Sequence, residues 1–442
     1  MALQENSMGK YLAWAPLVAG LVFAAASMSS AQTETVIHTF QSNKNDGAGT
    51  SSGLTADFRG ALYGVTSMGG KYNAGCVYRF VPPTVEGGNW TESIIYSFTG
   101  RADGGTPTGN LYLDPRSQHL FGTAVGGVNG HGVVFELIPG SPWTEKVLYR
   151  FKGTTDGSSP QWGVVTDNGG AVYGTAVGGG SGKQGVVFRL QPPAQRGGAW
   201  TESVLYRFTG GSDGGYPFAP VIVDSTRSVY GTTWYYPSSP GTVFRLSPPV
   251  GTGPWTLTTL YAFAGGTDGA GPSGGLLFDS AGLLYGTTQS GGNPVCTANP
   301  AAPCGTVFKL TPPSGGTGPW TESVLYAFTG GSDGGQPSAG LIFDSNGAVY
   351  GTTRAGGALT KVCGTYGSGF PFGCGTVFKV APSSGGTWTE SVLYAFQGPP
   401  NGPSDGASPV TPLVFVGGNL FGTTAWGGYP FGDDGEVFEV IP

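Results

Sequence analysis

Seven aspartates, each followed directly by glycine, are the acidic residues that recur most regularly in the sequence. Six have proline four residues later, and the first has Thr50 at that position. A ring of carboxylates could attract a cation or a basic ligand. However, Asp-Gly is also the usual turn former, and one carboxylate per loop is far from a calcium cage. We therefore predict repeated turns at Asp46, Asp103, Asp156, Asp213, Asp268, Asp333 and Asp405.

Other residue types that could catalyse a reaction are scattered along the chain. None of the histidines has metal-ligand spacing; they are His38, His119 and His131. Residues 210–214 and 330–334 match a nucleophile elbow by letters, but no helix follows them. Catalysis in a repeat protein usually breaks the repeat, and we find no convincing break. The sequence predicts no catalytic residue, metal site or cofactor.

The five cysteines suggest cross-links instead. Cys296 and Cys304 share one loop, and Cys363 and Cys374 share the equivalent loop of the next repeat. In an oxidising compartment each pair would form a local disulfide that contributes about 2–3 kcal/mol. Cys76 is then left as a buried free thiol. The cysteines lack the paired spacing of a zinc site.

These residues belong to a module that occurs seven times. Its fullest copy contains GLIFDSNGAVYGTT from Gly340, GTVFKV from Gly375 and WTESVLYAF from Trp388. The module predicts four antiparallel strands, which we call a, b, c and d, because its apolar runs are short and bounded by Gly, Pro, Asn or Asp. Alternation in strand d places Trp388, Val392, Tyr394 and Phe396 on one face and Leu393 on the other.

The ends of the chain complete one another. The last copy stops after its strand c at Pro442, whereas residues 33–40, TETVIHTF, align with TESVLYAF at 389–396. An open array has no use for this split repeat, but a ring closes on it and leaves no free sheet edge. We therefore predict an all-β fold over residues 32–442: a seven-bladed β-propeller of four-stranded blades, closed by an N-terminal strand that completes the last blade.

Residues 1–31 are typical of a signal peptide. Lys10 precedes an apolar run from Leu12 to Ala26, and small residues follow as far as Ala31. An uncleaved membrane anchor is the alternative, although the run is short for a bilayer span. We predict a secreted, periplasmic or cell-surface protein without a membrane span in its mature chain. The formal charge of -6 argues against nucleic acid as a partner.

The DGG-x-P, LYGTT, GTVF and WTESVLY elements resemble the GloVer tandem repeat of exported bacterial proteins. The resemblance covers residues 33–442. It implies export and repetition, and it names no reaction.

The loops between strands b and c vary most between the copies. They emerge on the same face as the d-to-a connections, and aromatic side chains on loops can stack on sugars or grip a peptide. The alternative is that these aromatics only cover the ends of the blades. The candidate ligand-binding residues are Trp234, Tyr235, Tyr236, Trp426, Tyr429 and Phe431.

Our leading hypothesis is an exported, monomeric, non-catalytic module that binds carbohydrate or peptide through this face. One alternative is a propeller lyase or hydrolase with its site at the axial channel, using loop carboxylates such as Asp433 and Asp434. A second is a structural repeat protein of the cell surface.

Overall fold

The chain divides into two units, Met1–Ala31 and Gln32–Pro442. The computed structural model describes only residues of the second unit: 33–41, 43, 45–50, 52–85, 87–195, 197–234, 240–294, 304–316, 318–358, 373–398, 405–427 and 434–442. The predicted signal peptide lies outside the described residues. Within them, no helix has the length and apolar character that a membrane crossing needs.

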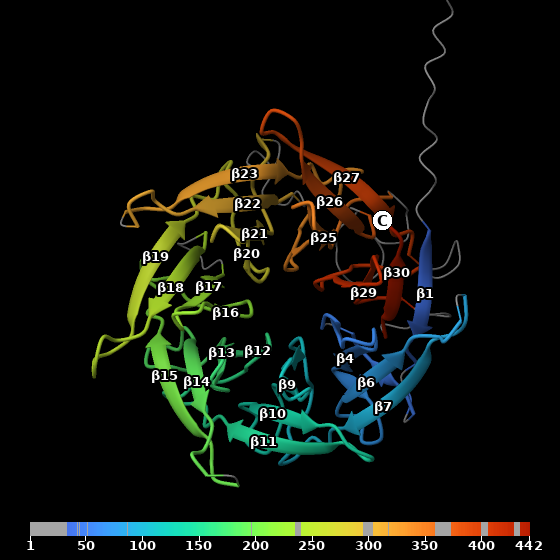
Figure 1. Cartoon of the computed structure of the whole chain (residues 1–442), viewed down its shortest axis with the longest axis vertical. Coiled ribbons are helices and arrows are strands. Elements are labelled where there is room, and N and C mark those ends of the chain that lie inside the picture. Colours follow the sequence, from blue (N-terminus) through green and yellow to red (C-terminus); the bar gives the residue numbers. More distant parts are fainter. Residues whose placement is uncertain are drawn as a thin grey trace, which may run out of the picture. The chain divides into compact units, whose positions relative to one another are not determined.

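The described part of the second unit forms seven four-stranded antiparallel sheets around a common centre (Figure 1). The first blade contains β3 (Thr55–Ala56), β4 (Leu62–Thr66), β6 (Cys76–Val81) and β7 (Thr91–Ser97). The second contains β8 (Tyr112–Leu113), β9 (Leu120–Ala124), β10 (Val133–Ile138) and β11 (Thr144–Arg150). The third contains β12 (Val164–Thr166), β13 (Val172–Ala176), β14 (Val186–Gln191) and β15 (Thr201–Arg207).

The next blades repeat this order. The fourth contains β16 (Ile222–Val223), β17 (Val229–Thr233), β18 (Thr242–Ser247) and β19 (Thr256–Ala262). The fifth contains β20 (Leu277–Phe278), β21 (Leu284–Thr288), β22 (Thr306–Thr311) and β23 (Thr321–Ala327). The sixth contains β24 (Ile342–Phe343), β25 (Val349–Thr353), β26 (Thr376–Pro382) and β27 (Trp388–Ala395). A small ribbon pairs β2 (Gly47–Ala48) with β5 (Met68–Gly69).

The seventh blade joins the two ends of the propeller. It contains β28 (Val414–Val416), β29 (Asn419–Thr424), β30 (Glu436–Val440) and, at its edge, β1 (Glu34–Thr39). β1 runs antiparallel to β30, and the Phe40 amide donates to the Gly435 carbonyl over 3.1 Å. Figure 1 shows the blue β1 beside the red β30. The predicted seven-bladed fold and its closure by the N-terminal strand are confirmed.

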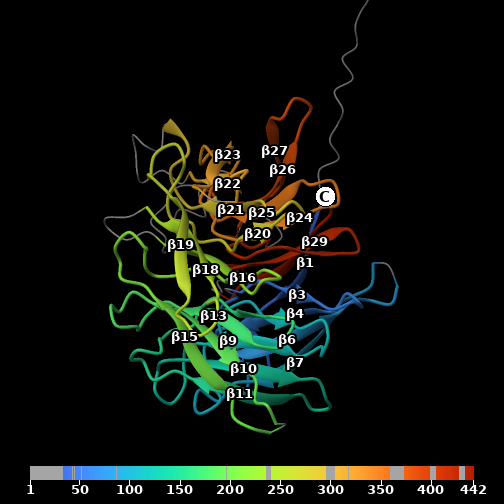
Figure 2. The same ribbon diagram turned by 60° about the vertical axis from the view of Figure 1, so that its left-hand side comes forward.

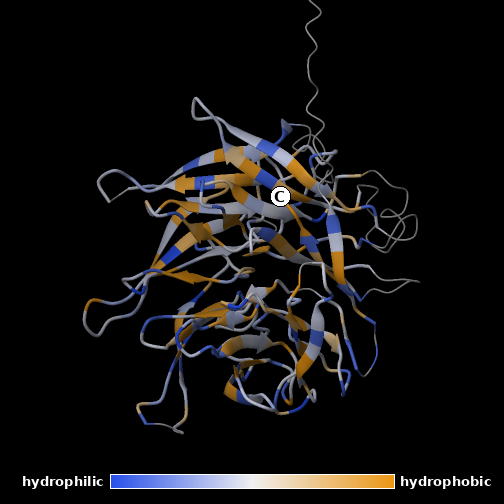
Figure 3. Ribbon diagram, turned by 45° about the vertical axis from the view of Figure 1, so that its right-hand side comes forward, coloured by the Kyte–Doolittle hydropathy of each residue, from blue (hydrophilic) through white to orange (hydrophobic). Residues whose placement is uncertain are grey.

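The hydrophobic core is divided among the seven seams between adjacent blades. Each seam holds one cluster of buried side chains, and the cluster between the seventh and first blades contains Phe40, Tyr78 and Phe421. Figure 2 shows the blades from another direction. Figure 3 shows many of the hydrophobic residues along the strands. Each sheet therefore buries both of its faces against its neighbours, as stacking of sheets in a ring requires.

The LYGTT element, whose tyrosine is phenylalanine in the second and seventh blades, lies in the second strand of each blade. Its glycine lets the side chains of adjacent strands pack closely. In the third blade the Tyr173 hydroxyl donates to Asp167 in the preceding turn over 3.0 Å. A Cβ atom at Gly174 would lie only 2.6 Å from Cζ of Phe188 on the adjacent strand. Glycine is thus required by the Phe188 ring that covers it, not by a turn.

The glycine of the GTVF element, just before the third strand of each blade, has a different role. Gly185 has a φ of +90°, and a Cβ there would lie 2.5 Å from Cδ of Pro217 in the loop of the next blade. Left-handed backbone and close contact both favour glycine. At six of the seven seams the proline that follows the Asp-Gly turn packs on this glycine, and at the seventh Thr50 takes the place of the proline.

The pairing register between the two outer strands shifts by one residue in every blade. In the sixth blade Val377 pairs with Tyr394 and Phe378 with Val392, which leaves Leu393 unpaired. Trp388 consequently packs on the cluster between the fifth and sixth blades, whereas Phe396 belongs to the next cluster. Our prediction that these two aromatics share a face is wrong, because a β-bulge exchanges the faces on either side of it.

Candidate functional site

The Asp-Gly loops bind their own blade through a repeated hydrogen bond. The Asp103 carboxylate accepts from the Tyr96 hydroxyl at 3.0 Å and from the Thr99 amide at 2.7 Å. Burial alone would raise the pKa of Asp103, but these bonds outweigh it and lower that pKa. The same tyrosine-to-aspartate bond joins Tyr149 to Asp156, Tyr206 to Asp213, Tyr261 to Asp268, Tyr326 to Asp333 and Tyr394 to Asp405.

A glutamate of the next blade's outer strand adds a second carboxyl group to most of these seams. Burial, followed by the charge of Asp103, raises the pKa of Glu145 to about 7. The same causes raise the pKa to about 7 for Glu202, Glu322 and Glu390, with Asp156, Asp268 and Asp333 as the respective charges. The aspartates thus serve the seams between blades and are not gathered at the axis.

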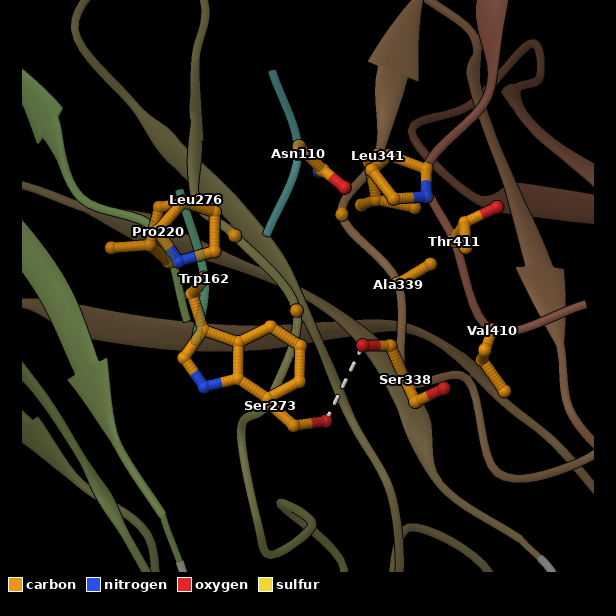
Figure 4. Close-up of a pocket in the computed structure, with 14 residues that line it drawn as sticks. Asn110, Trp162, Pro220, Ser273, Leu276, Ser338, Ala339, Leu341, Val410 and Thr411 are labelled. Carbon is orange, nitrogen blue, oxygen red and sulfur yellow. Dashed lines mark hydrogen bonds between the residues drawn. The ribbon is translucent and has the colours of Figure 1, made fainter. Parts of the chain in front are cut away.

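A cavity of about 180 Å³ lies where six of the seven blades converge. Its walls come from the segments that precede the innermost strands, so it occupies the centre of the ring at the end where the d-to-a connections arrive. Figure 4 shows Trp162 on one side and Thr411 on the other. The polar side chains of this lining are Asn110, Trp162, Ser273, Ser338 and Thr411. The described lining residues contain no carboxylate, imidazole or thiol.

Three aromatic rings from neighbouring blades extend from this cavity. Trp162 precedes β12, Phe218 precedes β16 and Trp234 follows β17. The Trp162 and Phe218 centroids are 4.5 Å apart with their planes tilted at 57°. Phe218 stacks on Trp234 at 5.1 Å and 26°. We call these three residues the aromatic row.

The two indole nitrogens of the aromatic row have no acceptor among the described residues. Nε1 of Trp162 and Nε1 of Trp234 are buried, and no described residue accepts a hydrogen bond from either. The Ser338 hydroxyl on the cavity wall is likewise buried, and no described residue forms a hydrogen bond with it. A ligand or water that reached these atoms would satisfy groups that are costly to leave unpaired.

The predicted ligand-binding aromatics have separate places in the fold. Trp234 belongs to the aromatic row, whereas Trp426 bridges Ala407 through its backbone and packs on the core cluster between the sixth and seventh blades. Within the described ranges, no ring contact joins Trp426 to the aromatic row. The remaining candidates, Tyr235, Tyr236, Tyr429 and Phe431, lie outside the described residues.

Sequence reasoning missed Trp162 and Phe218. Both follow the proline of a d-to-a loop, by two residues and by one. Alignment of the copies on that proline would have exposed them, since the other copies carry Thr, Ser, Val, Ala or Gly at the two positions. That these two rings meet Trp234 is visible only in the structure.

The cysteines lie where the pattern places them as far as they are described. Cys76 is a free thiol, fully buried in β6, and burial raises its pKa to about 12. Cys304 and Cys374 are buried at the ends of their loops. Their predicted partners, Cys296 and Cys363, lie outside the described residues, so both pairings stay predictions.

The residues considered for catalysis do not meet at the cavity. Nδ1 of His119 lies 2.7 Å from Oε1 of Glu136, and neither residue lines the cavity. Asp434 accepts the Gly49 amide with its backbone carbonyl at 3.0 Å, and Asp433 lies outside the described residues. His38 is different: with Asp46 and Glu92 it forms a group of ligating atoms that sequence spacing did not indicate.

Comparison with solved structures finds other propeller-like chains at low identity. A gluconolactonase of Xanthomonas campestris has a TM-score of 0.39 and 13% identity, covering 76% of this chain and 85% of its own. PorZ, a surface component of the type-IX secretion system of Porphyromonas gingivalis, has a TM-score of 0.48 and 16% identity, covering 88% and 46%. A polysaccharide lyase has a TM-score of 0.46 and 11% identity, covering 89% and 90%.

Comparison with protein sequences and family models identifies the family of the chain. No curated protein matches the chain at a significant level. The family model of the Gloeobacter/Verrucomicrobia repeat matches residues 18–236 and 126–365, which together extend over more than half of the 442 residues. The resemblance drawn from the repeated motifs is thereby confirmed, and the chain belongs to the Gloeobacter/Verrucomicrobia repeat family.

Proposed function

We propose that this protein is an exported, non-catalytic module that binds carbohydrate at the central cavity and the adjoining aromatic row. The observation that carries the proposal is the aromatic row itself, whose two indole N–H groups find no acceptor in the part of the chain that the structure describes. Sugar rings offer C–H faces that pack on indoles and hydroxyls that accept hydrogen bonds from them. A stacked row beside a cavity with hydroxyl and amide groups supplies both kinds of contact.

The chemistry of the described cavity lining supports binding over hydrolysis or elimination. General acid and base catalysis needs titratable side chains within hydrogen-bond reach of the reacting group. The lining offers hydroxyls, an amide, an indole and aliphatic groups. These groups can orient a neutral polar ligand, but they do not exchange protons near neutral pH.

Export and the two disulfides belong to the same proposal. Residues 1–31 would direct the chain to an oxidising compartment, where Cys296 would pair with Cys304 and Cys363 with Cys374. Each bond would restrain a long loop on the ligand-binding face. Free-thiol counting on the exported protein under denaturing conditions should then detect Cys76 alone.

Binding of purified protein to a glycan array, followed by titration of the best ligand, tests the proposal. We expect Trp162→Ala and Trp234→Ala each to weaken binding about tenfold, equivalent to ~1.4 kcal/mol. Tyr72→Ala is the matched control, because Tyr72 is an exposed aromatic in the b-to-c loop of the first blade and lies outside the aromatic row. Unchanged affinity in both tryptophan variants, or turnover of the bound glycan, would overturn the proposal.

A further inference from the structure

The closing strand departs from the repeat at one side chain. In six blades a tyrosine of the outer strand donates its hydroxyl to the aspartate of the following loop, whereas β1 carries His38 at this position. Nε2 of His38 lies 3.3 Å from both Asp46 carboxylate oxygens and 3.7 Å from Oε2 of Glu92 on β7. A hydroxyl has thus been replaced by a nitrogen that can ligate a metal.

The three side chains are close enough to share one ion. One ligating atom from each of His38, Asp46 and Glu92 lies within 4.8 Å of the others, and no further described group of three or more such residues is this compact. A zinc ion bonds nitrogen and oxygen at about 2.0–2.2 Å, so ligands around it must come within a few ångströms of one another. Small side-chain rotations would bring these atoms to bonding distance.

Independent contacts hold His38 and Asp46 in place. The Asp46 carboxylate accepts from the Gln41 and Gly47 amides at 2.9 and 2.7 Å. The His38 ring packs edge-on against Phe40 at 4.8 Å between centroids. Oε1 of Glu92 is buried, and no described residue donates a hydrogen bond to it. The same oxygen also lacks a described partner in the equivalent residues Glu145, Glu202, Glu322 and Glu390, so the feature that sets this seam apart is His38 in the place of tyrosine.

We propose that His38, Asp46 and Glu92 form a zinc site that ties the closing strand to the first blade. One imidazole and two carboxylates match the nitrogen and oxygen ligands that zinc accepts, and water would complete a tetrahedral shell. His38 belongs to β1, Asp46 to the loop that follows and Glu92 to β7. The bound ion would therefore join the seventh blade to the first, at the seam next to the pairing of β1 with β30.

The proton competes with zinc at this site. Burial disfavours the charged His38 ring, but the hydrogen bond to Asp46 and the charge of Glu92 outweigh burial, and the pKa of His38 is raised. Zinc binds the neutral imidazole. Binding should consequently be measured at about pH 8, where competition from the proton is weakest.

The test uses the mature chain, freed of metal with a chelator, and zinc chloride as the probe. We expect calorimetry to detect one zinc per chain and the melting temperature to rise when zinc is restored. His38→Tyr restores the residue that the other six blades use, so it should fold normally. It should bind zinc at least about tenfold more weakly, since even the loss of an outer-shell partner costs that much.

A second variant and a second ion separate the site from general effects. Glu92→Leu copies Leu257, which occupies the corresponding position of β19, and should likewise lose zinc-dependent stabilisation. Calcium, which prefers oxygen ligands, should not replace zinc. Equal zinc affinity in wild type and His38→Tyr, or a wild-type melting temperature that ignores zinc, would overturn the proposal. Glycan binding is read separately, so either proposal can fail alone.

Discussion

The glycine of each LYGTT element allows the side chains of the two neighbouring strands to pack over it. A glycine between two β-formers weakens a strand by its own propensity. Here the Phe188 ring lies over Gly174, and Val164 approaches from the innermost strand, so that a Cβ would meet both. Glycine is therefore needed here because side chains of the adjacent strands occupy the space of a Cβ atom. Local strand propensity does not predict this requirement.

Gly174→Ala should consequently destabilise the propeller by about 1–3 kcal/mol, as overpacking of a close-packed core does. Gly315→Ala is the control, because nothing lies within 4 Å of a Cβ at that exposed turn. It should change the free energy of unfolding by less than about 0.5 kcal/mol. Denaturant unfolding of both variants measures the difference, and equal effects would contradict this account of the motif.

At the scale of elements, β1 closes the ring. Its ladder to β30 gives the seventh blade its outer strand, and Phe40 is buried in the core cluster of the last seam. Without β1, β30 would become an exposed sheet edge. The core cluster that contains Phe421 would also lose side chains contributed by the N-terminal segment. Sheet edges of this kind promote association between chains.

Removal of residues 32–40 should therefore lower the melting temperature markedly and increase aggregation, compared with a chain that begins at Gln32. Differential scanning calorimetry and light scattering measure the two effects. A synthetic peptide of residues 33–40 should restore part of the lost stability by pairing with β30. If the shortened chain melts at the same temperature, closure by β1 does not stabilise the ring.

At the scale of the whole molecule, the seams give the ring a common response to pH. Burial and a neighbouring aspartate raise the pKa of Glu145, Glu202, Glu322 and Glu390 from 4.5 to about 7. For Glu34 in β1, burial and then the charges of Asp405 and Glu436 raise the pKa to about 8. These carboxyl groups bind protons more tightly in the folded ring than in the unfolded chain.

The sign of the effect follows from proton linkage. Stabilisation by a carboxyl with a raised pKa is complete below its unfolded pKa, about 4.5, and is lost as pH rises through the folded value of about 7. Aspartates with a lowered pKa, such as Asp103, lose their contribution as pH falls instead. The melting temperature should thus be highest near about pH 5 and fall towards about pH 8.

A pH series of melting temperatures checks this expectation. Glu202→Leu, which copies the residue at position 257, should make the decline shallower because one raised carboxyl is removed. A melting temperature that is constant from about pH 5 to about pH 8 would show that these groups ionise without cost.

The sequence by itself determined the repeat, the number of blades and the closing strand. Those properties can be derived by comparing segments of the sequence with one another. The motifs recur at a regular period, and residues 33–40 match residues 389–396. Turn chemistry at the Asp-Gly loops is local as well, because the carboxylate bonds its own loop and strand.

Only the tertiary structure decided which residues meet across blades. Trp162, Phe218 and Trp234 stack because two d-to-a connections and one b-to-c loop converge, and His38 meets Glu92 because the ring closes. The bulge at Leu393 likewise sends Trp388 and Phe396 to different seams. Each contact depends on the curvature and register of packed sheets, which no short-range sequence pattern encodes.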